Sequence, residues 1–213
     1  MCSSDLLEPL ARRLWRAGAG PHRPAAEREP RELRGAVAGL IGWSENARVF
    51  AALLIHCGVR VIVWSEHAPE GQIEAAGAAR ASLGEVLAAD IVSLHRGLNP
   101  DTRHFLGASE LARLRPGAVL INIARGALIE PAALYARLRH GDVIACLDTF
   151  EAEPLAPGHP LRALPNVFLT SHIAGGSRDM RAAAAREVTR KVLDHLRGAG
   201  GETLTRERLQ TMS

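Results

Sequence analysis

The sequence lacks any long hydrophobic run, and it is poor in cysteine, lysine and aromatic residues. No stretch approaches the ~18 consecutive apolar residues of a membrane-spanning helix, so no membrane partner is expected. A net charge of only +3 over 213 residues gives no indication of a nucleic-acid partner. Lys191 is the only lysine, and many arginines beside abundant alanine indicate coding bias rather than a phosphate-binding surface.

The three cysteines, Cys2, Cys57 and Cys146, are widely spaced and form no C-x-x-C pair. This pattern suits reduced thiols rather than a disulfide framework, so a cytoplasmic location is expected and no metal site is predicted. Residues 1–10 lack the basic region and apolar core of a signal peptide.

Four regions are expected along the chain. Residues 1–6 include Cys-Ser-Ser-Asp-Leu, which a common sequencing-adapter sequence encodes in one reading frame, so they are interpreted as a non-native scar. A native disordered start is the alternative. Residues 7–32 are expected to hold a short amphipathic helix, 7–15, and a linker. Residues 33–198 form the predicted domain, and residues 199–213 a flexible tail.

A glycine-containing turn lies between an apolar run, 36–41, and a helical pattern, 48–57. A second apolar run, 59–64, follows after Gly58. Strand, turn, helix and strand in this order are typical of the opening of a dinucleotide-binding unit. The fingerprint G-x-G-x-x-G is only partly present, because Gly42 stands in the first position, Ser44 in the second and Ala47 in the third.

Further strands are predicted at 91–95, 118–123, 143–147 and 167–170, with helices at 82–89, 109–114, 131–140 and from the Ser177 cap to Gly198. Residues 65–77 are expected to be a loop with a weak helix. Non-alternating strands separated by helices predict an α/β fold of the Rossmann type, a doubly wound parallel sheet with helices on both faces.

Polar groups follow three of these strands, at Asn122–Gly126, Asp148–Pro154 and Thr170–Gly175. The carboxyl ends of parallel strands share one rim of the sheet, so an arginine, acids and a histidine are expected to meet there. Each is common as a solvated loop residue when taken singly, but three successive strand ends together indicate an active site.

These motifs resemble the nucleotide-binding domain of the D-isomer-specific 2-hydroxyacid dehydrogenases. The resemblance covers about residues 33–198 and rests on the segments Leu33–Gly35, Gly39–Gly42, Asp90–His95, Pro100–His104, Arg115–Gly126, Leu147–Pro154, His159–Leu161 and Pro165–Gly175.

The resemblance implies three catalytic residues. Arg125 would hold the substrate carboxylate and carbonyl oxygen in a bidentate fork. His172 would be the general acid in reduction and the base in reverse. Glu153 would pair with His172; it is preferred over Glu151 because the family's acid directly precedes the proline.

The resemblance also implies a cofactor site. Asp148 would face the nicotinamide, and Arg96, Ile123, Ala124 and Gly175 would line the cofactor. The complete set of expected cofactor-binding residues is Gly42, Ser44, Glu45, Asn46, Ser65, Glu66, Arg96, Ile123, Ala124, Asp148 and Gly175.

The turn departs from the family. Ser44 replaces a glycine that lets the backbone approach the pyrophosphate, and Glu45 stands where the family usually has arginine. Ser44 is also a good N-cap and Glu45 a good first-turn acid, so the free amides at the helix start have less need of a bound phosphate. Weak cofactor binding is therefore predicted. Glu66 follows Ser65 at the end of the second strand and would repel a 2′-phosphate, which favours NAD over NADP.

The sequence thus predicts an NAD-linked oxidoreductase domain that reduces small 2-oxo acids to D-2-hydroxy acids, with a homodimer expected in the full-length form. The family's second lobe comes mostly from sequence before this domain, so little turnover is expected from this chain alone. The alternative is a non-catalytic dinucleotide-sensing or protein-binding relative with a decayed glycine turn. The arginine, glutamate and histidine argue against that alternative, and the turn argues for it.

Overall fold

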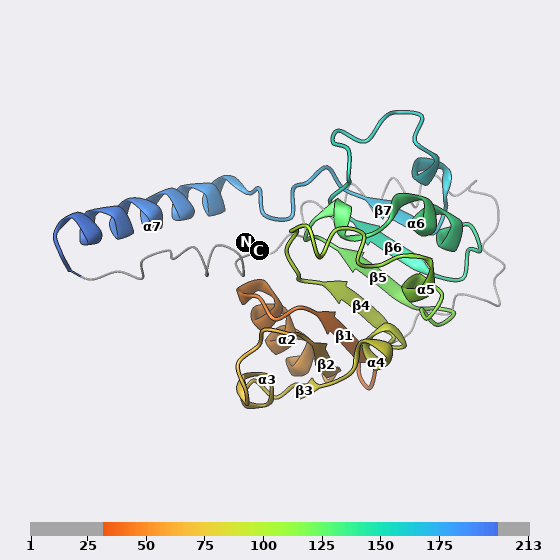
Figure 1. Ribbon diagram of the computed structural model, residues 1–213, viewed down its shortest axis with the longest axis horizontal. Coiled ribbons are helices and arrows are strands. Elements are labelled where there is room, and N and C mark those ends of the chain that lie inside the picture. Colours follow the sequence, from red (N-terminus) through yellow and green to blue (C-terminus); the bar gives the residue numbers. More distant parts are fainter. Residues whose placement is uncertain (1–31, 200–213) are drawn as a thin grey trace. The chain divides into compact units, whose positions relative to one another are not determined.

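A computed structural model describes residues 32–199, and the expectations for residues 1–31 and 200–213 lie outside the described part. The central feature is a fully parallel sheet with strand order β3-β2-β1-β4-β5-β6-β7 (Figure 1). The strands are β1 (Val37–Ile41), β2 (Arg60–Trp64), β3 (Ala79–Arg80), β4 (Ile91–Leu94), β5 (Val119–Asn122), β6 (Ile144–Leu147) and β7 (Val167–Leu169). The predicted Rossmann-type architecture is confirmed.

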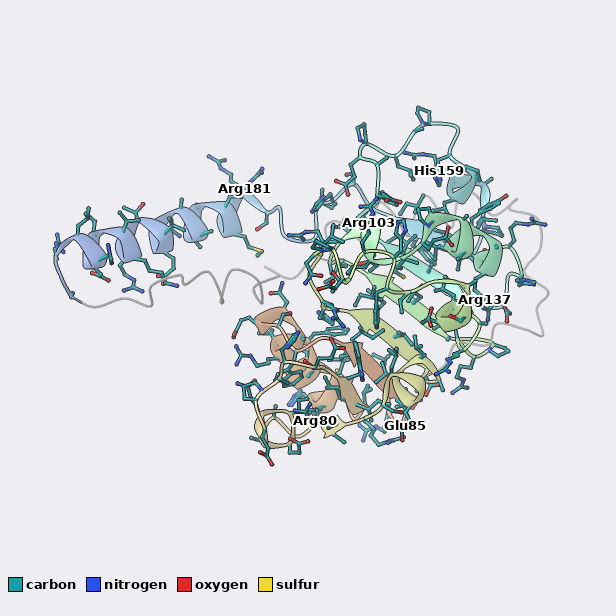
Figure 2. All side chains as sticks on the ribbon, in the orientation of Figure 1. Arg80, Glu85, Arg103, Arg137, His159 and Arg181 are labelled. Carbon is teal, nitrogen blue, oxygen red and sulfur yellow. The ribbon has the colours of Figure 1, made fainter. Side chains whose placement is uncertain are left out.

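Helices connect the strands, as parallel crossovers require. Between successive strands lie α2 (Glu45–His56), α3 (Gln72–Ala75), α4 (Leu83–Leu87), α5 (Ala108–Leu111) and α6 (Pro131–Leu138). The short 3₁₀ turn η1 (Gly126–Leu128) precedes α6, and a second one, η2 (Pro160–Ala163), lies between β6 and β7. The helix α7 (Arg178–Leu196), which carries the Arg181 labelled in Figure 2, follows β7.

The central strands of the sheet are buried on both faces, as successive residues of β1 show. Leu40 packs into one hydrophobic cluster with Ala51 and Leu54 of α2, whereas the next residue, Ile41, packs into the other. Side chains alternate across a strand, so a non-alternating apolar strand must be covered on both sides. This is the physical reason that the apolar runs predicted a doubly covered parallel sheet.

Local capping signals agree with the helix starts. Ser82 and Glu85 form the predicted capping box at α4, and Pro131 occupies the first turn of α6. The predicted start of α2 at Arg48 was wrong, because the helix begins at Glu45 and Ser44 caps it. The two-residue strand β3 was not predicted, since two exposed residues carry no periodic signal.

The last helix, α7, was predicted from apolar residues that recur every four positions. The structure has this helix over Arg178–Leu196, capped by Ser177 as expected, and none of its residues is buried. Within residues 32–199, no helix is long and apolar enough to cross a membrane. The cysteines of this part, Cys57 and Cys146, are both free.

Candidate active site and cofactor cleft

The glycine turn after β1 requires a glycine at its first position. Gly42 has φ +98°, and a Cβ placed on it would lie 2.7 Å from the backbone oxygen of His95. The amide of Gly42 donates to the Trp64 carbonyl at 2.8 Å, which ties the turn to the end of β2. Since a side chain would collide with backbone, Gly42 is what lets β1 turn into α2 beside β4.

The start of α2 satisfies its own polar groups. The Ser44 hydroxyl accepts a hydrogen bond from the Ala47 amide at 3.3 Å, and Glu45 forms an ion pair with Arg48 one turn later. Asn46 is exposed beside them. The helix N-terminus thus carries an acid and a capping hydroxyl where an incoming phosphate would bind.

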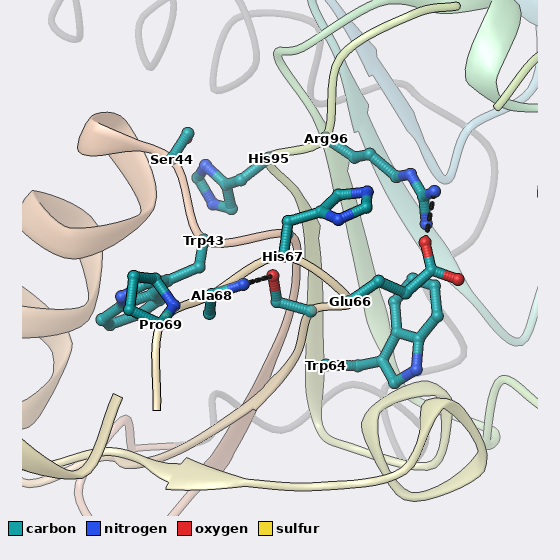
Figure 3. Close-up of a pocket in the computed structure, with 11 residues that line it drawn as sticks. Trp43, Ser44, Trp64, Glu66, His67, Ala68, Pro69, His95 and Arg96 are labelled. Carbon is teal, nitrogen blue, oxygen red and sulfur yellow. Dashed lines mark hydrogen bonds and ion pairs between the residues drawn. The ribbon is translucent and has the colours of Figure 1, made fainter. Parts of the chain in front are cut away.

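A cavity of about 310 Å³ opens between this turn, the end of β2 and the end of β4. Figure 3 shows its lining, including Trp43, Glu66, His67, His95 and Arg96. The Ser65 hydroxyl accepts from the Ala68 amide at 3.2 Å, so it stabilises the loop after β2.

Arg96 forms an ion pair with Glu66 at 2.6 Å in the wall of this cavity (Figure 3). Its guanidinium carbon lies 5.2 Å from the ring centroid of Trp64 and 5.0 Å from that of Phe105. The Arg96 side chain is 16% exposed and that of Glu66 50% exposed. The two aromatic rings therefore hold the arginine, while the glutamate is the more exposed partner.

His95 lies under the same cavity. It is 7% exposed, its Nε2 lies 3.0 Å from the Ser93 hydroxyl, and its ring lies 5.5 Å from that of Phe50. Burial lowers the pKa of His95 from 6.5 to about 4, so the imidazole is neutral at physiological pH.

A second cavity, of about 320 Å³, joins the glycine turn to the end of β5. Its lining residues are Ser44, Glu45, Asn46, Leu94, His95, Arg96, Gly97, Ile123, Ala124 and Arg125. The structure thus brings Arg125 into one cavity with the predicted cofactor residues. Asp148, Glu153, His172 and Gly175 line neither this cavity nor the first.

The buried side-chain amide of Asn122 holds the loop after β5, a role that was not predicted from the sequence. Asn122 is 1% exposed; its Nδ2 donates to the Arg125 carbonyl at 2.9 Å, and its Oδ1 accepts from the Ala124 amide at 3.1 Å. The signal was its place at the strand end, immediately before Ile123. These bonds leave the Ile123 and Arg125 side chains exposed at the rim.

Gly126 brings this loop against the next one. A Cβ on Gly126 would lie 2.0 Å from the backbone carbon of Phe150. Only glycine permits this approach of the β5 loop to the loop after β6. Gly126 lies in a strand-end motif of the sequence, but no role was predicted for it, because its contact with Phe150 joins residues distant in sequence.

Glu153 and His172 meet at the ends of β6 and β7. The Nδ1 of His172 lies 2.8 Å from Oε2 of Glu153, and Oε1 of Glu153 accepts from the Phe150 amide at 2.9 Å. The hydrogen bond with His172, then that from Phe150, hold the pKa of Glu153 below its usual value. Glu151 instead pairs with Arg103 and His104.

Asp148 lies beside this pair and is 3% exposed. Burial alone would raise its pKa, but hydrogen bonds from the Thr170 hydroxyl and from the Ala174 and Ile173 amides outweigh burial and lower the pKa. The carboxylate is therefore ionised although it is buried. Thr170 lies in a motif that the sequence placed at a strand end, but no role was predicted for its hydroxyl.

The residues around the glycine turn fit a dinucleotide in part. Gly42 has the backbone freedom of the first fingerprint glycine, and the cavities on either side of Ser44 lie at the carboxyl ends of the strands, where such folds bind ligands. Glu45 fits poorly beside phosphates. Within residues 32–199, no group of three or more histidine, cysteine or acidic side chains is arranged to hold a metal ion.

Comparison with known proteins agrees with this geometry. A family model described as the NAD binding domain of D-isomer specific 2-hydroxyacid dehydrogenases matches residues 9–174. A glyoxylate reductase of Aeropyrum pernix is 38% identical over 156 residues, which are 72% of this chain and 47% of that protein. The chain thus spans about half the length of this curated relative.

Two solved structures extend the comparison. A D-isomer specific 2-hydroxyacid dehydrogenase from Lactobacillus delbrueckii ssp. bulgaricus, in its NAD-complexed form, has a TM-score of 0.76 at 26% identity, over 88% of this chain and 60% of that one. An acyclic imino acid reductase in complex with NADPH and D-arginine has a TM-score of 0.78 at 27% identity, over 94% and 62%.

Proposed function

Because the chain belongs to the family of D-isomer specific 2-hydroxyacid dehydrogenases, we propose that it is the dinucleotide-binding half of an enzyme that reduces small 2-oxo acids to D-2-hydroxy acids. The hydrogen bond between His172 and Glu153 carries the proposal. A carboxylate placed on one ring nitrogen leaves the other nitrogen free to give a proton, which a purely structural histidine does not need.

The proposed substrate-binding group is Arg125. Its side chain is exposed, its Nη1 donates to the Ala124 carbonyl at 2.7 Å, and it lines the cavity that extends to the glycine turn. The planar guanidinium presents paired N–H donors to a carboxylate, so Arg125 binds and orients the carboxylate of the 2-oxo acid.

His172 is the proposed proton donor. Glu153 accepts from Nδ1 and fixes the orientation of the ring, which leaves Nε2–H for the carbonyl oxygen of a substrate held by Arg125. The proton passes from Nε2 to the oxygen as negative charge develops there. In the oxidative direction, neutral His172 takes the proton back.

The proposed cofactor is a nicotinamide dinucleotide, which supplies the hydride. The residues proposed to hold it are Gly42, Ser44, Glu45, Asn46, Ser65, Glu66, Arg96, Ile123, Ala124, Asp148 and Gly175. We favour NAD over NADP because Glu66 presents a carboxylate in the first cavity. The pairing of Glu66 with Arg96 weakens that preference, because part of its charge is already neutralised.

Glyoxylate is the first substrate to test, since the relative from Aeropyrum pernix is a glyoxylate reductase. The domain is proposed to span residues 33–198, and the full-length protein is proposed to be a cytoplasmic homodimer by analogy with the family. Little turnover is expected from this chain alone, because the His172 and Glu153 side chains are 51% and 35% exposed and water has access to them.

A second candidate is a non-catalytic dinucleotide-sensing or protein-binding relative. The start of α2 supports it, because Ser44 caps the Ala47 amide and Glu45 pairs with Arg48 without any bound phosphate. The paired Glu153 and His172 argue against it, since a binding module requires neither.

Two measurements separate the candidates. NADH and NADPH titrations of the chain, followed by fluorescence, test cofactor binding. Reduction of glyoxylate and larger 2-oxo acids is then assayed with the chain joined to the substrate lobe of a relative. We expect turnover that His172→Ala abolishes, with Cys57→Ala as an unaffected control. Turnover that survives His172→Ala would refute the proposed mechanism, and dinucleotide binding without turnover in the joined protein would favour the second candidate.

A further inference from the structure

Both carboxylate oxygens of Asp148 are engaged by the segment that carries His172. Oδ1 accepts from the Ile173 amide at 2.9 Å and from the Thr170 hydroxyl, and Oδ2 accepts from the Ala174 amide at 3.0 Å. Asp148 belongs to the end of β6, whereas these donors follow β7. The acid therefore bridges two neighbouring strand ends.

The backbone of Asp148 contributes a fourth bond to the same segment, because its carbonyl accepts from the His172 amide at 2.9 Å. His172 has φ +56°, the left-handed conformation that a residue with a side chain seldom adopts. Hydrogen bonds to Asp148 lie on both sides of this residue and hold it in that conformation.

Apolar packing does little to hold the segment. Residues 171–175 are all exposed, and Ile173 itself is 56% exposed. With no buried side chain in these five residues, the bonds to Asp148 are the main restraint that the described part of the chain offers. Bonds from backbone amides to an ionised carboxylate are stronger than those between neutral groups.

We propose that Asp148 is a positioning residue for His172: its carboxylate forms hydrogen bonds to residues 170–174 and so places the imidazole beside Glu153. We call this set of hydrogen bonds the latch. This role adds to the expectation that Asp148 faces the nicotinamide, because each carboxylate oxygen can accept more than one hydrogen bond. It rests on the proposed function only in giving His172 the role of proton donor. The latch itself is a property of the folded chain.

Two acids then divide the work at this histidine. Asp148 holds the backbone of the segment, and Glu153 orients the ring. Loss of Asp148 should therefore uncouple His172 from Glu153 even though Glu153 remains. A residue that only contacts cofactor would leave this coupling intact.

The test uses Asp148→Asn and Thr170→Val in the chain without cofactor. The asparagine keeps the size of the side chain but gives up one acceptor, and the valine removes only the hydroxyl donor. Amide exchange of Ile173 and Ala174 is measured by NMR, together with the chemical shifts of the His172 ring in each variant with and without Glu153→Gln. Asp142→Asn, which removes the partner of Arg137, is the matched control.

In Asp148→Asn we expect exchange of the two amides to accelerate about tenfold and the effect of Glu153→Gln on the His172 ring chemical shifts to shrink to less than half. Thr170→Val should show both changes in smaller measure, and Asp142→Asn neither. If Asp148→Asn fails to fold, Thr170→Val decides. Unchanged exchange and unchanged coupling in a folded variant would overturn the latch, whereas an inactive joined enzyme with both changes present would refute only the proposed function.

Discussion

The Nδ1 atom of His172 and the Oε2 atom of Glu153 lie 2.8 Å apart although 19 positions separate the two residues in the sequence. They come from the loops after β7 and β6, which are neighbouring parallel strands. The other oxygen of Glu153, Oε1, accepts a hydrogen bond from the Phe150 amide, and this bond fixes the orientation of the carboxylate beside the ring. This arrangement engages Nδ1 of His172 and leaves Nε2 as the ring nitrogen that does not contact Glu153.

Replacing Glu153 by Gln should weaken the hydrogen bond at Nδ1 of His172, since a charged acceptor is exchanged for a neutral amide. The measurement is the chemical shift and solvent exchange of the His172 ring N–H, followed by NMR. Glu151→Gln is the matched control, because that carboxylate pairs with Arg103 and His104 instead. An equal effect from both variants would contradict the specific pairing.

Replacing Ser44 by Gly and Glu45 by Arg together should tighten NADH binding about tenfold, because an acid beside the phosphates is exchanged for a cation. Fluorescence titration measures the affinity. Glu74→Arg makes the same charge change on an exposed position of α3 and should leave the affinity unchanged. No gain in the double variant would mean that the turn does not limit binding.

Replacing Glu66 by Gln should raise the affinity for NADPH relative to NADH. The change removes a carboxylate from the first cavity and frees Arg96, which Trp64 and Phe105 hold in place, to pair with a 2′-phosphate. Titration with both dinucleotides gives the ratio, which we expect to shift about tenfold. Glu70→Gln, an exposed acid in the same loop, is the control. A ratio that moves equally in both variants would point to general charge instead.

His95 should make the domain less stable in acid. Its folded pKa of about 4 lies below the ordinary 6.5, so the unfolded chain binds more protons between these values. The stabilisation is complete above pH 6.5 and is lost as pH falls toward 4, by up to about 3 kcal/mol.

Urea unfolding between pH 7 and 4.5 measures this dependence. His95→Phe should remove part of the slope in that range, whatever its effect at pH 7, while His56→Phe, an exposed position at the end of α2, should retain it. Identical slopes in the wild type and His95→Phe would show that other groups cause the acid instability.

Gly126→Ala should destabilise the domain by more than about 2 kcal/mol and disturb the loop that carries Glu153, since the added Cβ would overlap the backbone of Phe150 and Glu151. Urea unfolding measures the loss. Gly158→Ala is the control, because nothing lies within 4 Å of a Cβ at that position. Equal stability of the two variants would show that the β5 and β6 loops separate at little cost.

Much of the fold was predictable because it depends on local signals. Apolar runs such as 36–41 indicated buried strands, and the Ser82 capping box and Pro131 marked helix starts within a residue or two. The errors came where the signal was weak. Glu45 and Asn46 are polar, so the apolar pattern alone placed the start of α2 at Arg48 although Ser44 was recognised as a cap, and β3 is too short to show a period.

The site was predictable only as a set of strand ends. The sequence alone determined the order of the strands' polar motifs and, through the parallel topology, that the motifs with Arg125, Glu153 and His172 follow strand ends at one edge of the sheet. Only the tertiary structure decided that Glu66 is paired with Arg96, that Gly126 presses against Phe150, and that Asp148 holds the His172 segment. These relationships join residues distant in the chain, and short-range patterns carry no information about which side chains meet once the sheet has brought the loops together.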